Sequence, residues 1–204
     1  MIRSIACFLV SGTFWLVAAP SFGQWNVTTF DDAGAGLGQI NNQDEGEGLV
    51  RIQAPASGPT GFDVINFHDS GNQGQFTGAT QVAYPGVSGN DFAVLIDGFV
   101  NLPGGFGTSV TTNLGINSDD GYTLRINGVF LDERGNQGVP NDNGIWNNVT
   151  LHHGDYIRIM QYERGGGASV EVLSDTDGDI GTTGDLNLLG SAASGVDLVG
   201  TSVI

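Results

Sequence analysis

Asn117-Ser118-Asp119-Asp120-Gly121-Tyr122-Thr123-Leu124-Arg125-Ile126-Asn127-Gly128 is the stretch that decides the fold of this chain. It contains strand-like runs separated by turn residues, and the Asn-Gly pair at its end favours a type I′ hairpin turn. Val129-Phe130-Leu131 then returns as the partner strand. The adjacent carboxylates of Asp119 and Asp120 repel each other unless a cation, amide donors or water stabilises them. We therefore interpret this tip as the functional centre and favour Ca²⁺ as the neutralising ion.

Further strand-like segments lie on both sides of this hairpin. Apolar and β-branched runs predict strands in these ranges: 25–30, 49–53, 62–67, 91–100, 108–117, 149–159 and 169–172, with closing strands near 185–190 and 196–199. The polar, glycine-spaced segments between them predict turns and loops, at 31–48, 55–61, 68–90 and 132–148. The pattern indicates an all-β chain.

Composition restricts the partners of this protein. The 204 residues include 34 Gly, 22 acidic residues and only 6 basic residues, all Arg, and the formal net charge is −16. Nucleic acids and anionic membrane surfaces attract basic patches, so we expect no nucleic-acid binding. Divalent cations and neutral ligands such as sugars suit the acidic chain better.

The first 23 residues have the pattern of a secretory signal peptide. Arg3 precedes an apolar run, and the small residues Ser21 and Gly23 precede a predicted cut before Gln24. An uncleaved membrane anchor is the alternative. No later apolar run is long enough to span a bilayer, so we expect no membrane insertion after cleavage. The prediction is a secreted, extracellular or cell-surface protein with one β-domain at 24–204 and, because Cys7 lies in the leader, no disulfide.

The loop at 132–148 contains candidate sugar-contacting residues. Trp146 could stack on a pyranose ring and Asn143 could bond its hydroxyls, although a Trp in a loop can equally fill the core. A second acidic segment, 175–180, places Asp175, Asp177 and Asp179 at the spacing of an EF-hand loop. Ile180 stands where that loop needs Gly, so an acidic linker is the preferred interpretation and a weak Ca²⁺ site the alternative.

Three motifs in order make the chain resemble the PA-fourteen domain family, which includes the anthrax protective antigen, yeast flocculins and GLEYA adhesins. The first is the Ser118-Asp119-Asp120-Gly121 tip with its hairpin, in which Asn127 replaces the commoner Asp. The second is the segment 149–159, and the third is Tyr162-Glu163-Arg164-Gly165-Gly166-Gly167-Ala168 with the strand after it. The resemblance is clearest at 92–172.

This resemblance implies an antiparallel β-sandwich or barrel. In the adhesin branch it also implies Ca²⁺-dependent sugar binding through the paired Asp, joined by a cis peptide bond and faced by a second loop. The matching positions here are Asp119 and Asp120, with Glu163 as a further metal ligand. Arg164, Gly165 and Gly166 of the facing loop are then expected to contact the ligand. That loop lacks the Asn that the adhesin branch carries there.

Two alternatives to a lectin-like module remain. In the first, Asp119 and Asp120 cap a structural turn while Glu163 pairs with Arg125, Arg158 or Arg164, and the chain is a structural or protein-interaction module of an exported assembly. The second is an enzyme. The chain lacks a serine-elbow motif, zinc-ligand spacing and a phosphate-binding loop. We therefore expect a non-catalytic glycan-binding protein, with the structural module as the alternative.

Overall fold

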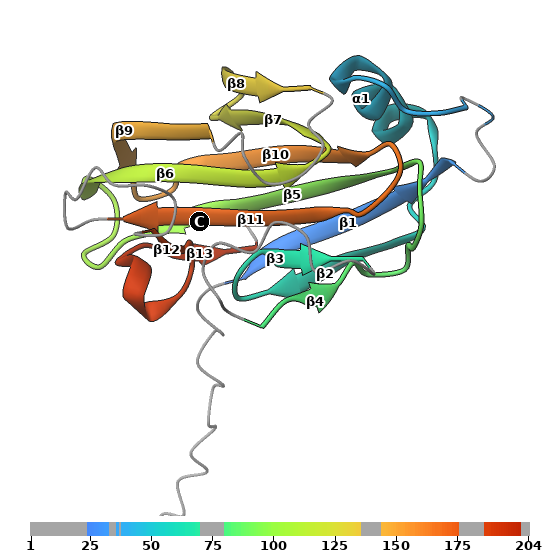
Figure 1. Cartoon of the computed structure of the whole chain (residues 1–204). Helices are drawn as coiled ribbons and strands as arrows, with labels where there is room; N and C mark the ends of the chain where they lie inside the picture. Colours follow the sequence, from blue (N-terminus) through green and yellow to red (C-terminus); the bar gives the residue numbers. More distant parts are fainter. Residues whose placement is uncertain are drawn as a thin grey trace, which may run out of the picture.

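The computed structural model describes residues 24–32, 36, 38–69, 80–135, 144–175 and 186–200. The predicted leader, the Asn143 position and most of the EF-hand-like segment lie outside these residues. The described part forms two β-sheets packed face to face, with helix α1 beside one of them (Figure 1). The predicted all-β fold is confirmed as a sandwich of two sheets, which do not close into a barrel.

The first sheet, sheet A, contains the longer N-terminal strands and the predicted hairpin. Its order is β2 (Ser57–Phe62), β1 (Trp25–Asp31), β5 (Phe92–Asn101), β10 (Tyr156–Glu163), β7 (Gly121–Ile126) and β8 (Val129–Arg134), and β13 (Asp197–Val199) also pairs with β5. All of these pairs are antiparallel. Strand β10 at the centre therefore connects β5 to the hairpin.

The second sheet, sheet B, faces sheet A across the core. Its order is β4 (Val82–Ala83), β3 (Asn66–His68), β11 (Ser169–Asp175), β6 (Ser109–Asp119) and β9 (Gly144–His152), and β12 (Asn187–Leu188) also pairs with β11. The β3–β4 pair is parallel, whereas the other pairs are antiparallel. Sheet B is therefore antiparallel apart from the short β3–β4 pair.

The core lies between the sheets because strand side chains alternate between two faces. On β5 the alternate residues Phe92, Val94 and Ile96 point inward and are buried. Leu114 and Ile116 of β6 meet them from sheet B. Burial of this apolar surface is the main term that holds the two layers together.

Helix α1 (Gln43–Ile52) corrects two predictions, because 31–48 was expected to be a loop and 49–53 a strand. The Asn42 side chain caps the helix by accepting a 3.0 Å hydrogen bond from the Glu45 amide. Acidic residues in the first turn and Arg51 in the last suit the helix dipole. Leu49 packs against Met160 of β10 on the outer face of sheet A. Gly46 and Gly48 obscure this amphipathic pattern in the sequence.

Other boundaries also differ from the predictions. The expected turn at 55–61 is mostly the edge strand β2, a position that tolerates Pro59. The expected strand 149–159 is divided by a turn between β9 and β10. Trp146 belongs to β9 instead of a loop. In the described part of the chain, no helix combines the length and apolarity needed to cross a membrane.

Candidate functional site

The chain crosses from sheet B to sheet A at the paired aspartates. Strand β6 ends at Asp119, which lies opposite Ser169 of β11, and β7 begins at Gly121, which lies opposite Tyr162 of β10. The Asp119–Asp120 peptide bond is cis, as the family resemblance implied. Asp120 lies between β6 and β7, close to Glu163, the last residue of β10.

Gly121 allows the chain to cross close to Arg134 and Tyr162 because it has no side chain. A Cβ atom at this position would lie 2.5 Å from the Arg134 carbonyl oxygen and 2.5 Å from the Tyr162 ring. Real Cβ atoms do not approach other heavy atoms so closely, so a larger residue would push the hairpin away from β10. The glycine after the aspartates is therefore a packing requirement of the site.

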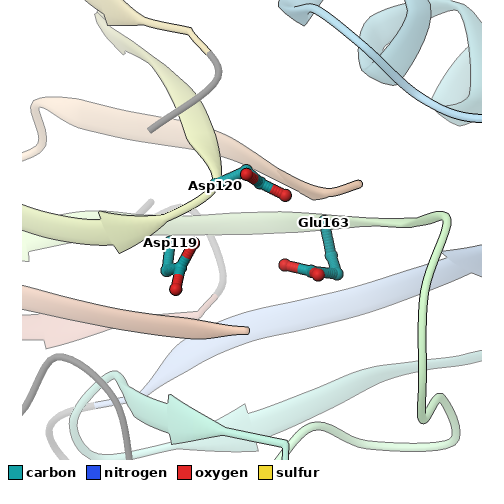
Figure 2. Close-up of side chains that lie close together, drawn as sticks. All are labelled: Asp119, Asp120 and Glu163. Atoms are coloured by element: carbon teal, nitrogen blue, oxygen red, sulfur yellow. The ribbon is translucent and has the colours of Figure 1, made fainter. Parts of the chain in front are cut away.

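Three carboxylates converge at this crossing. Asp119, Asp120 and Glu163 each offer an oxygen atom, and these atoms all lie within 4.8 Å of one another. Figure 2 shows the three side chains close together, with those of Asp120 and Glu163 extending into the same space. The residues are 4, 5 and 0% exposed, respectively. Such a set of buried oxygen donors could hold a metal ion.

The electrostatics show that the cluster does not tolerate three negative charges. Burial raises the pKa of Glu163 to about 9, and the charges of Asp120, Asp119 and Asp69 contribute to the rise. Burial also raises the pKa of Asp120, although hydrogen bonds from the backbone amides of Arg164 and Gly165 act to lower it. Without a cation, Glu163 therefore carries a proton at neutral pH.

The oxygens of Glu163 have an unusual environment for a buried carboxyl group. Both oxygens are buried, and within the described residues their polar neighbours are the Asp120 carboxyl group and the Gly165 backbone N–H. Burial beside other carboxyl groups costs hydration free energy that these two neighbours only partly offset. The predicted alternative partner, Arg158, instead forms an ion pair with Glu47 at 3.3 Å, and Arg125 lies over the Phe130 ring.

The loop between β10 and β11 contacts the aspartates directly. The backbone N–H of Arg164 donates a 2.6 Å hydrogen bond to Oδ2 of Asp120. The N–H of Gly166 donates to Oδ1 of Asn90 at 3.2 Å, and Gly166 adopts φ +108°, a conformation that L-residues rarely adopt. Arg164 and Gly165 therefore lie beside Asp120, and Asn90 holds Gly166. Trp146 lies on β9, outside this loop.

Trp146 is a partly buried residue of β9. It packs against the core, with the Tyr122 ring in an edge arrangement at 6.3 Å between centroids. Gly144, two residues earlier, provides space, because a Cβ there would overlap both the Tyr122 hydroxyl and the Trp146 ring. The structure thus places Trp146 where the core-filling alternative put it, and Asn143 lies outside the described residues.

Three residues near the cluster were not identified from the sequence. Asp69 follows β3, donates its N–H to the Ala168 carbonyl at 3.0 Å and adds negative potential at Glu163. The pKa of the buried Tyr84 hydroxyl is raised well above its usual value by burial and by Glu163. Asn90 contacts the glycine loop. Each is distant in sequence from Asp119, so no local motif marks it.

Comparisons with known proteins agree with this fold. No protein-family model matches the sequence, and no curated protein matches it. Among solved structures, the PA14 (PA-fourteen) sugar-binding domain from an RTX adhesin is similar at a TM-score of 0.57 and 19% identity, covering 82% of this chain and 94% of that one. The PA14 domain of the antifreeze protein MpAFP has a TM-score of 0.52 and 17% identity, covering 83% of this chain and 92% of that one. The chain has a PA14-type fold.

Proposed function

We propose that this protein is a non-catalytic, Ca²⁺-dependent carbohydrate-binding module. The observation that carries the proposal is the convergence of Asp119, Asp120 and Glu163, whose side chains are buried and whose carboxylate oxygens lie within 4.8 Å of one another. A divalent cation would satisfy these oxygens and neutralise most of the charge that raises the Glu163 pKa. The PA14 sugar-binding domain from the RTX adhesin, which has the same fold, supports the glycan part.

The donor set fits Ca²⁺ better than other biological cations. All three side chains offer hard carboxylate oxygens, and no His or Cys belongs to the cluster. Ca²⁺ takes about six to eight oxygen ligands, and three carboxylates supply three to six of these. The remaining ligands would be backbone carbonyls, water and two hydroxyl groups of a sugar.

The ligand would then lie over the ion at the end of the sandwich. Arg164, Gly165 and Gly166 flank Asp120 and form one wall. Asn143, which lies outside the described residues, and Trp146 of β9 stay predicted sugar contacts. The partner is a glycan or cell-surface polysaccharide, and the predicted leader at 1–23 suits secretion or display at the cell surface.

A calorimetric titration with Ca²⁺ followed by a glycan array tests this function. We expect wild-type protein to bind Ca²⁺ and to bind glycans only without chelator. The Asp119→Asn/Asp120→Asn variant, which preserves side-chain size, should lose both activities. Asp63→Asn/Asp197→Asn is a matched control, since it removes two charges from exposed positions. Wild-type protein that binds neither Ca²⁺ nor glycans would refute the proposal and leave the structural module.

A further inference from the structure

Asn90 is an exposed residue before β5 whose side chain holds the glycine loop of the candidate site. Its Oδ1 accepts the 3.2 Å hydrogen bond from the Gly166 N–H, although the two residues are 76 positions apart. Only the amide oxygen of Asn can accept from an N–H group, so the bond fixes the orientation of the amide. The loop is therefore attached to Asp120 at Arg164 and to Asn90 at Gly166.

The contact continues along the loop. A Cβ atom built on Gly165 would lie 3.5 Å from both the amide carbon and Nδ2 of Asn90, which is ordinary van der Waals distance. The Asn90 amide therefore faces Gly165 with room for a Cβ atom between them, and the bond to Gly166 is what holds the loop. The part of the loop next to Asp120 is thus shaped by a residue from a different connection.

The backbone beside Asn90 is itself fixed. Asp91 has φ +62°, and its Oδ1 accepts a 3.1 Å hydrogen bond from the Ile40 N–H. The carbonyl oxygen of Asp91 accepts a 3.0 Å hydrogen bond from the Asp32 N–H. An exposed side chain on an anchored backbone loses little conformational freedom when it binds a ligand, which favours a role in recognition.

We propose that Asn90 is a positioning and specificity-determining residue of the glycan site. Its oxygen fixes Gly166, two residues after the Arg164 N–H that donates to Asp120, and its Nδ2 group donates to a hydroxyl of the sugar bound at the ion. This inference rests on the proposed function. A carboxamide suits the task because it presents an acceptor to the loop and a donor to the ligand at the same time.

Two variants separate the roles of the amide. Asn90→Ala removes both groups, whereas Asn90→Asp keeps the acceptor for Gly166 and removes the donor. Ser88→Ala, an exposed position on the same connection, is the control. The measurements are calorimetry with Ca²⁺ alone, titration of the Ca²⁺-loaded protein with galactose, glucose, mannose and fucose, and hydrogen exchange of the Gly166 amide.

We expect both Asn90 variants to bind the preferred sugar about tenfold or more weakly, as for loss of a hydrogen bond to a sugar hydroxyl. Ca²⁺ affinity should change by less than about threefold, because the three carboxylates are retained. Gly166 exchange should accelerate in Asn90→Ala and stay unchanged in Asn90→Asp, a separation that a general loss of stability would not produce.

The outcomes distinguish this inference from the proposed function. Wild-type sugar affinity in Asn90→Asp would overturn the donor role, and unchanged Gly166 exchange in Asn90→Ala would overturn the positioning role. Wild-type protein that binds neither Ca²⁺ nor any glycan, these sugars included, would instead refute the function itself. In that case the Gly166 measurement still decides whether Asn90 positions the loop.

Discussion

Oδ2 of Asp120 accepts a 2.6 Å hydrogen bond from the backbone N–H of Arg164, a residue 44 positions further along the chain. This bond joins the crossing between the sheets to the loop between β10 and β11. Glu163, the residue before Arg164, is consequently held within the carboxylate cluster. The ionisation of the cluster and the conformation of the loop are therefore coupled, and the predictions below follow from that coupling and from the packing around it.

Glu163 should make the Ca²⁺-free protein less stable as the pH rises. Its pKa of about 9 exceeds the ordinary value of 4.5, so its contribution to stability is complete below about pH 4.5 and is lost as the pH approaches 9. Between pH 5 and 8.5 the free energy of unfolding should fall by on the order of a few kcal/mol. Urea denaturation in chelator at several pH values measures this change.

Glu163→Gln is the control for that experiment, because Gln is uncharged at every pH. Its free energy of unfolding should vary less with pH than that of the wild type. The difference between the two curves is the contribution of Glu163. Parallel pH curves for the two proteins would show that Glu163 already ionises near its ordinary pKa in the folded state.

Ca²⁺ binding should release a proton from the cluster. The ion requires an ionised Glu163, which is protonated below about pH 9 in the ion-free protein. Between pH 6 and 8 the affinity should increase by up to about tenfold per pH unit. Calorimetry in two buffers with different ionisation enthalpies counts the protons. Equal apparent enthalpies in the two buffers would contradict this prediction, and Glu163→Gln should release fewer protons than the wild type.

Gly121→Ala should destabilise the crossing between the sheets. The added methyl group would overlap the Arg134 carbonyl and the Tyr162 ring, each 2.5 Å away. Overpacking of this kind costs about 1–3 kcal/mol. Thermal unfolding measured in chelator should show a lower Tm, and Ca²⁺ affinity should fall as Asp120 is displaced from Glu163. An unchanged Tm would mean that the hairpin can move away from β10 without loss.

The glycines of α1 should respond in opposite directions to alanine. A Cβ at Gly46 would lie 3.0 Å from the Met160 Sδ and 3.1 Å from the Tyr162 Cβ, whereas a Cβ at Gly48 has no neighbour within 4 Å. We expect Gly46→Ala to destabilise the protein and Gly48→Ala to stabilise it by about 0.5–1 kcal/mol, the helix-propensity difference. Chemical denaturation of both variants measures the contrast. If both variants were more stable than the wild type, helix α1 could move away from sheet A without loss of packing energy.

The hairpin could be predicted from the sequence because local interactions specify it. Asn127 and Gly128 have φ values of +52° and +78°, as the predicted turn requires, and Ile126 pairs with Val129 across it. Helix α1 could not be predicted in this way. Gly46 and Gly48 lower its intrinsic helix propensity, and burial of Leu49 against sheet A compensates for that loss only in the folded chain.

The sequence by itself determined the alternation that forms the two sheets, the hairpin turn and the adjacency of Asp119 and Asp120. Those features depend on backbone conformation and side-chain period within a few residues. Only the tertiary structure decided which residues surround the aspartates. Asp69, Tyr84, Asn90 and Glu163 approach them because β3, β5, β10 and β11 are paired in a particular register, and that register is set by burial over the whole core.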